Sequence, residues 1–128
     1  MPQPLLAFRI PARAVSLSEA RRSIEALHDR LPQSVIWDLT LLVNELVSNC
    51  IVHGGLTPEH EIEVNLEWAA QRVRVQICDS TPPERYLNSN RPKPTTSGGF
   101  GLFFLERLSD RWGVDGGCVW FELDGAGG

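Results

Sequence analysis

The sequence predicts an α+β fold, in which helices cover one face of a mixed, mostly antiparallel sheet to form a two-layer sandwich. The main observation is the order of the expected elements: strand, two helices, hairpin, aperiodic segment, helix and hairpin. A second observation is the apolar spacing, which is helical over residues 16–52 and alternating from residue 62. With 128 residues and 42% hydrophobic content, one core can be buried, so we expect a single domain over 1–128 with a flexible tail at 124–128.

The first expected elements are a short strand and a helix. Residues 5–10 are apolar enough for a strand, and Pro11 restricts that strand to an edge or an end of the sheet. Ser16 or Ser18 is expected to cap a helix that runs to about Arg30, because a serine hydroxyl can accept a hydrogen bond from the first N–H groups of a helix.

A second, more apolar helix follows. The pair Leu31-Pro32 is expected to stop the first helix, and Ser34 to cap the second, which reaches about Val52. His53-Gly54-Gly55 then closes it, because glycine readily adopts the left-handed conformation at a helix end.

The second half of the chain changes period. Residues 62–68 and 73–77 alternate apolar and polar side chains around Ala69-Ala70-Gln71, which predicts an antiparallel hairpin. A third helix is expected over 101–110. The last expected elements are strands at 112–114 and 118–123, turned by Asp115-Gly116-Gly117, and the four tryptophans (Trp37, Trp68, Trp112 and Trp120) are expected in the core or on a sheet face.

Residues 80–99 lack any periodicity and contain four prolines. A structureless segment of this length inside a compact domain is usually a functional lid or disordered, and we expect a lid. Its cations Arg85, Arg91 and Lys93 could meet phosphate charge, or they could be scattered solvated residues.

Composition excludes several classes of function. The net charge of −4 gives no electrostatic footprint for nucleic acid or an anionic membrane, so direct DNA binding is not expected. No apolar stretch approaches the roughly 20 residues that span a bilayer, and no basic leader precedes one, so we expect a cytoplasmic protein with no membrane partner. Cys50, Cys78 and Cys118 are odd in number and widely spaced, which predicts three buried thiols rather than disulfides or a zinc site.

Glu45 and Asn49 are candidate site residues on the second helix. They are four residues apart and about 40° from each other around the helix, with Asp38 nearly in line. Such a stripe is often a solvated face, but Leu41 and Val52 flank it, which favours the half-buried wall of a cleft.

Asp79 is a candidate at the end of the second strand of the hairpin. It has the parity of Val73, Val75 and Ile77, so its carboxylate would continue a core-facing row and would need a hydrogen-bond donor. The alternative is a strand that ends one residue early, with Asp79 turned into a polar loop.

A glycine cluster, Gly98-Gly99-Phe100-Gly101, precedes the third helix. Unpaired N–H groups and the helix dipole favour a phosphate at such a helix start, and glycine lets the backbone approach it closely. A plain flexible connector is the alternative. His53 is most simply a helix C-terminal residue that interacts with the dipole.

Taken together, the segments ELVSNCIVHG (45–54), Asp79 and GGFGL (98–102) resemble the N box, the adenine-binding aspartate and the second glycine motif of the GHKL ATPase superfamily. The chain is most similar to the small bacterial anti-sigma-factor serine/threonine kinases of that superfamily. The resemblance runs from about Phe8 to Leu123 and includes RWGV (111–114).

This resemblance implies a nucleotide site and protein partners. Asn49 would coordinate magnesium, Glu45 would act as general base, Asp79 would bind adenine, and Gly99, Gly101 and Leu102 would contribute to the ATP site. The cofactors would be ATP and Mg²⁺. The partners would be a sigma factor and an antagonist protein that is phosphorylated on serine or threonine, and pairing of two chains into a homodimer is left open.

The first glycine motif departs from the family pattern. The usual D-x-G-x-G is Asp79-Ser80-Thr81-Pro82-Pro83 here, and Cys118 stands where the family commonly has threonine. A weaker nucleotide site is therefore expected. A catalytically inactive, nucleotide-gated binding module is the alternative function.

Overall fold

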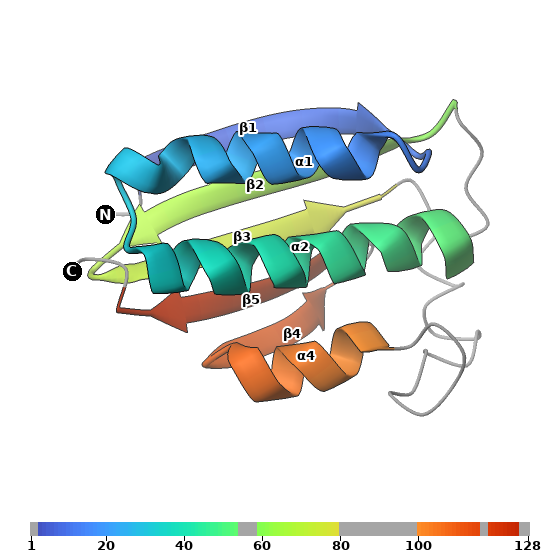
Figure 1. Ribbon diagram of the computed structural model, residues 1–128. Coiled ribbons are helices and arrows are strands. Elements are labelled where there is room, and N and C mark those ends of the chain that lie inside the picture. Colours follow the sequence, from blue (N-terminus) through green and yellow to red (C-terminus); the bar gives the residue numbers. More distant parts are fainter. Residues whose placement is uncertain (1–2, 54–58, 80–99, 116–117, 126–128) are drawn as a thin grey trace.

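The computed structural model describes residues 3–53, 59–79, 100–115 and 118–125, and for residues 52, 53 and 100–103 it describes the backbone only (Figure 1). The lid expected over 80–99 and the turns expected at Gly54-Gly55 and Gly116-Gly117 lie outside these residues. The single domain therefore stays an expectation.

The described strands form one five-stranded sheet in the order β1-β2-β3-β5-β4, with helices on one of its faces (Figure 1). All four strand pairings in this sheet are antiparallel. The α+β two-layer fold class is confirmed, and β1 lies at an edge, as Pro11 predicted. The elements are β1 (Gln3–Pro11), α1 (Ser16–Glu25), the 3-10 helix η1 (Ala26–Asp29), α2 (Gln33–His53), β2 (Glu61–Ala69), β3 (Arg72–Cys78), α4 (Phe100–Leu108), β4 (Arg111–Asp115) and β5 (Cys118–Asp124).

The β2–β3 hairpin has a two-residue turn without glycine. Ala69 pairs with Arg72, so Ala70 and Gln71 form the turn, with φ angles of 49° and 69°. Positive φ at both central residues matches the twist of the two strands, which explains why such turns are favoured in hairpins.

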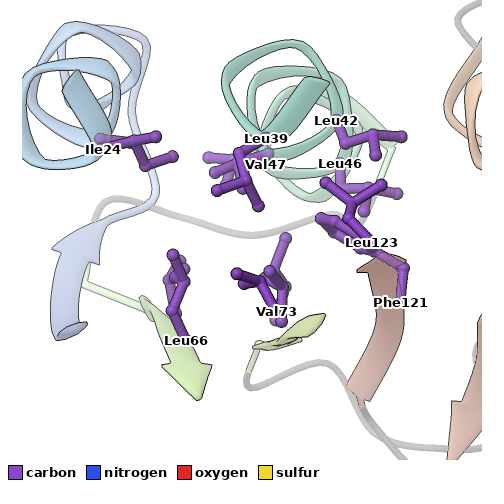
Figure 2. Close-up of a cluster of buried hydrophobic side chains, with 14 of the residues drawn as sticks. Ile24, Leu39, Leu42, Leu46, Val47, Leu66, Val73, Phe121 and Leu123 are labelled. Carbon is purple, nitrogen blue, oxygen red and sulfur yellow. The ribbon is translucent and has the colours of Figure 1, made fainter. Parts of the chain in front are cut away.

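The core lies between the helices and the sheet (Figure 2). Alternation along β3 buries Val73, Val75 and Ile77 against α2, while the residues between them lie on the opposite face. Figure 2 shows Ile24 of α1 and Leu39 and Val47 of α2 above this layer. Other members from α2 are Val35, Ile36, Leu42, Val43 and Leu46.

The expected serine caps are wrong. Ser16 Oγ donates to the Pro11 carbonyl at 2.7 Å and Ser18 Oγ donates to the Val15 carbonyl at 3.0 Å, and α1 has no side-chain cap. Ser34 lies inside α2, which begins at Gln33. Ser16 and Ser18 do not cap because a backbone carbonyl lies within hydrogen-bond reach of each hydroxyl. Ser34 does not cap because the helix begins before it.

Two further expectations are corrected by the structure. Cys78 and Cys118 form a disulfide with a Cα–Cα distance of 4.1 Å, and Cys50 remains a thiol. The prediction of three free thiols from their wide spacing was wrong because β3 and β5 are neighbours in the sheet, although their cysteines are 40 residues apart. Trp37 is 70% exposed on α2, in neither the core nor a sheet face.

One helix is long and apolar enough to span a membrane by length and composition, contrary to the expectation from sequence. The segment is Gln33–Ile51, with mean hydropathy 1.2, and it is most of α2. Because the buried face of α2 packs on the sheet, this segment is better explained as the central core helix of the domain.

Candidate functional site

The polar stripe predicted on α2 is present at the side of the helix. Asp38, Glu45 and Asn49 lie within about 40° of one another around α2, and all three are half-buried. The stripe therefore borders the core and is not a fully solvated face. It lies beside Leu42 and Leu46, which are buried, so the buried face of α2 extends up to the polar stripe.

Asp38 shows which way this stripe faces. Burial raises the pKa of Asp38, and the negative charge of Asp110 raises it further. Asp110 lies between α4 and β4, and its carboxylate accepts a hydrogen bond from the Asp124 backbone N–H at 2.7 Å. The polar stripe of α2 is therefore turned toward the α4 side of the molecule.

Three of the predicted segments converge at one end of the fold. Figure 1 shows α2 and β3 running in the same direction, so the half of α2 that carries Glu45 and Asn49 ends near the end of β3. The first turn of α4 lies at this same end, and α4 packs against α2. The fold thus brings together segments that are more than 50 residues apart in the sequence, since Asn49 and Phe100 are 51 residues apart.

Asp79 is the first residue after β3, which ends at Cys78. This is the early strand end that the polar-loop alternative required, and Asp79 is half-buried. Asp79 lines a hollow of about 380 Å³ together with Arg9, Glu59, His60, Glu61, Glu63 and Cys78. Glu45 and Asn49 are not among the lining residues of this hollow, so its walls do not join Asp79 to α2.

The start of α4 can receive an anion. Phe100 begins the helix, so Gly101 and Leu102 are in its first turn, where backbone N–H groups have no partner within the helix. The helix dipole adds a favourable field for phosphate at this point. Gly99 and the side chain of His53 lie outside the described residues, and their assigned roles stay predictions.

The sequence analysis missed a charged cluster on the face of the sheet opposite the helices. Glu122 of β5 accepts hydrogen bonds from Arg111 Nε at 2.6 Å and from Arg74 Nη1 at 3.2 Å. Arg72 approaches Glu122 at 3.7 Å and Asp124 at 3.6 Å. The available signal was the i, i+2 spacing of Arg72 and Arg74 on one strand and of the two acids on another.

Comparison with known proteins identifies the family. A model of the histidine kinase-like ATPase domain matches residues 10–123, which is nearly the whole chain. The chain belongs to the histidine kinase-like ATPase family. This membership confirms the resemblance to the GHKL superfamily that the three motifs indicated, and the family's fold accounts for the observed sheet and helices.

A solved structure of similar fold is that of the RsbU and RsbW domains of Rv1364c from Mycobacterium tuberculosis. The two share 20% sequence identity with a TM-score of 0.60, over 96% of this chain and 31% of that chain. The chain therefore spans about a third of the matched protein, and the likeness concerns the fold. No curated protein matches this ATPase domain.

Proposed function

We propose that this histidine kinase-like ATPase domain is an ATP-binding regulator of the anti-sigma kinase type, which binds a sigma factor and phosphorylates an antagonist protein on serine or threonine. The observation that carries the proposal is the family match over residues 10–123, combined with the convergence of the Asn49 half of α2, the end of β3 and the start of α4. It would act in the cytoplasm, and its net charge of −4 argues against direct nucleic-acid partners.

The donor set fits magnesium with ATP. Magnesium is bound in proteins by a few oxygen ligands together with water and substrate phosphates. Asn49 offers a neutral amide oxygen and Glu45 a carboxylate on the same half-buried stripe. Within the described residues, no group of three or more His, Cys, Asp and Glu could hold a metal ion, so a magnesium ion here would depend on the phosphates of the nucleotide.

Each candidate residue would have its own role in nucleotide binding or phosphate transfer. Asn49 would hold the metal, Asp79 would accept a hydrogen bond from the adenine amino group, and the N–H groups at Gly99, Gly101 and Leu102 would hold phosphate oxygens. Glu45 would accept the proton of the attacking serine or threonine hydroxyl as general base. Magnesium, when bound with ATP, supplies charge neutralisation at the phosphates.

A nucleotide-gated binding module without catalysis is the second candidate. The observation in its favour is the sequence Asp79-Ser80-Thr81-Pro82-Pro83, which lacks both glycines of the usual motif. Such a protein would still bind nucleotide through Asp79 and Asn49, and its partner affinity would follow the nucleotide state. Retention of Glu45 favours the kinase over the module.

Calorimetric titration with ADP and ATP, with and without magnesium, tests the nucleotide site. We expect wild type to bind and Asn49→Ala to lose most of the magnesium-dependent part of its ATP affinity. Asn44→Ala is the matched control, because Asn44 is also half-buried on α2 but lies roughly 140° away around the helix. Failure of wild type to bind nucleotide would contradict the function, and equal responses of the two variants would place the site on another side of α2.

A further inference from the structure

The Cys78–Cys118 disulfide joins two neighbouring strands at one end of the sheet. Cys78 is the last residue of β3 and Cys118 is the first residue of β5, and they are direct partners in the antiparallel register. Both are half-buried on the face of the sheet opposite the helices, because the alternate residues Ile77 and Val119 pack with the core. The bond therefore adds a covalent link at the point where this strand pair ends.

The position of this link matters because Asp79 follows Cys78 directly. Cys78 and Asp79 line the same hollow of about 380 Å³, with Arg9, His60 and Glu63. When the bond is closed, the backbone of Cys78 is held to β5 by Sγ–Sγ linkage as well as by strand pairing, and the adjoining backbone of Asp79 has less freedom. When it is open, strand pairing alone holds this end.

The environment proposed for the protein makes such a bond unusual. Glutathione and thioredoxin keep thiols reduced in the cytosol, and disulfides there are usually transient, catalytic or redox-sensing. A cross-strand pair at the last position of a strand is half-exposed to small reductants and oxidants. A core staple would instead be fully buried, as Val73 and Val75 are in the same strand.

We propose that Cys78 and Cys118 are a reversible dithiol–disulfide switch that sets the nucleotide affinity of the Asp79 site. This inference rests on the proposed function, since it concerns the same site. The closed form holds the residue before Asp79 in place, so the closed form binds ADP more tightly than the open form. Rigid positioning of a ligating group lowers the entropy lost on binding.

The reductant is a dithiol, such as a thioredoxin-type protein or dithiothreitol. One of its thiolates attacks one sulfur of the pair, the Sγ–Sγ bond breaks, and a mixed disulfide forms while the other cysteine leaves as a thiolate and takes up a proton. The second thiol of the dithiol then attacks the mixed disulfide. Two electrons and two protons thereby reach Cys78 and Cys118, and the dithiol becomes a disulfide.

The test is ADP calorimetry on wild type in two states whose thiols are counted with Ellman's reagent under denaturing conditions. The oxidised chain should give one thiol, that of Cys50, and the dithiothreitol-reduced chain should give all three. We expect ADP affinity to fall by about fivefold or more on reduction, the lower range of ordinary coupling between sites. Reoxidation should restore the affinity, with oxidised glutathione as the oxidant: it accepts the two electrons as the Sγ–Sγ bond re-forms and is itself reduced to two glutathione thiols.

Two variants make the result specific. Cys118→Ala cannot form the bond and adds no hydroxyl, so it should bind ADP like reduced wild type and should not respond to dithiothreitol. Cys50→Ser is the matched control, because it removes the third thiol and should keep the full redox response.

The outcomes separate the two proposals. Equal ADP affinity in both verified states, or tighter binding by the reduced chain, would overturn the switch and leave the nucleotide site standing. Absence of ADP binding in both states would overturn the proposed function, and the switch with it. Loss of the folded circular dichroism spectrum in both reduced wild type and Cys118→Ala would show that the bond is needed for folding and would also overturn the switch.

Discussion

The guanidinium carbon of Arg74 lies 4.2 Å from the ring centroid of Trp120, across the β3–β5 pair and on the face of the sheet opposite the helices. The same indole covers Gly113 of β4, where an added Cβ would come within 2.8 Å of Trp120 Nε1. One tryptophan therefore contacts side chains or backbone of both strands that flank β5. Stacking of a cation on an indole is favourable in such partly exposed positions.

We expect Gly113→Ala to destabilise the protein by about 1–3 kcal/mol, because the methyl group would push the Trp120 ring away from its place over β4. Urea denaturation measures the change. Val114→Ala is the control, since Val114 is 37% exposed in the same strand and should cost less than about 1 kcal/mol. In a Trp120→Leu background the cost of Gly113→Ala should shrink, and an unchanged cost would show that the indole is not its cause.

The lowered pKa of Glu122 predicts that the protein loses stability in acid. Burial alone would raise the pKa of Glu122, but hydrogen bonds from Arg111 and Arg74, helped by their charges, lower it overall from its usual 4.5. The stabilisation is therefore fully present above the unfolded-state pKa and is lost as the pH falls through the lower, folded-state pKa. Glu122→Gln should be less stable than wild type at pH 7 by about 1–3 kcal/mol, and the difference should shrink below pH 4.5.

Denaturant unfolding of wild type and Glu122→Gln across pH 3 to 7 would measure this. Glu67→Gln is the matched control, because Glu67 is an exposed carboxylate on the same face of the sheet. A difference between wild type and Glu122→Gln that stayed constant over this range would contradict the ionic origin.

Asp38 changes the pH dependence of stability in the opposite direction to Glu122. Burial and then Asp110 raise the pKa of Asp38 above its usual 3.8, so the unfolded chain releases this proton at a lower pH than the folded protein does. The free energy of unfolding consequently decreases as the pH rises through that interval. We expect Asp38→Asn to be slightly more stable than wild type at pH 7 and to lose this advantage below pH 3.8, whereas Asp115→Asn, at an exposed position, should show neither effect.

If Asp79 binds adenine, Asp79→Asn should bind ADP at least about tenfold more weakly than wild type, because a lost hydrogen bond to a charged group costs about 1.5–3 kcal/mol. Its thermal unfolding should stay close to that of wild type. Asp115→Asn removes an exposed carboxylate from the end of β4 and serves as the control. Equal affinities of Asp79→Asn and wild type would reject the adenine assignment.

General-base action by Glu45 predicts that Glu45→Ala still binds Mg-ATP and still captures its protein partner but transfers phosphate about 100-fold more slowly or worse. Radiolabelled transfer from ATP to serine or threonine of pulled-down partners is the measurement, with Glu19→Ala on the exposed side of α1 as control. Wild type without any transfer would favour the binding module. Transfer that persists in Glu45→Ala would require another base.

Local patterns in the sequence predicted the elements well. The alternation of Val73, Val75 and Ile77 placed β3 and its buried face, and the four-residue spacing of Glu45 and Asn49 placed both on one side of α2. These features depend on helical and strand periods, which a sequence shows directly. The roles of those two residues and of Asp79 stay predictions.

Features that depend on which strands become neighbours were not predictable from spacing alone. The pairing of β3 with β5 decides that Cys78 meets Cys118 and that Arg74 meets Glu122, yet nothing local in either segment specifies the partner. Ser16 and Ser18 failed as caps for a related reason, since their hydroxyls reach carbonyl groups whose positions depend on the path of the preceding chain.

The Cys78–Cys118 bond also changes how a cut chain would behave. Every peptide bond between these two residues lies inside a covalent ring that includes α4 and β4. A single cut within that ring would leave two fragments that migrate as one species until a reductant is added. The disulfide thus keeps two parts of the oxidised protein covalently linked even when the peptide chain between them is cut. One part contains α1 and α2, and the other contains β5.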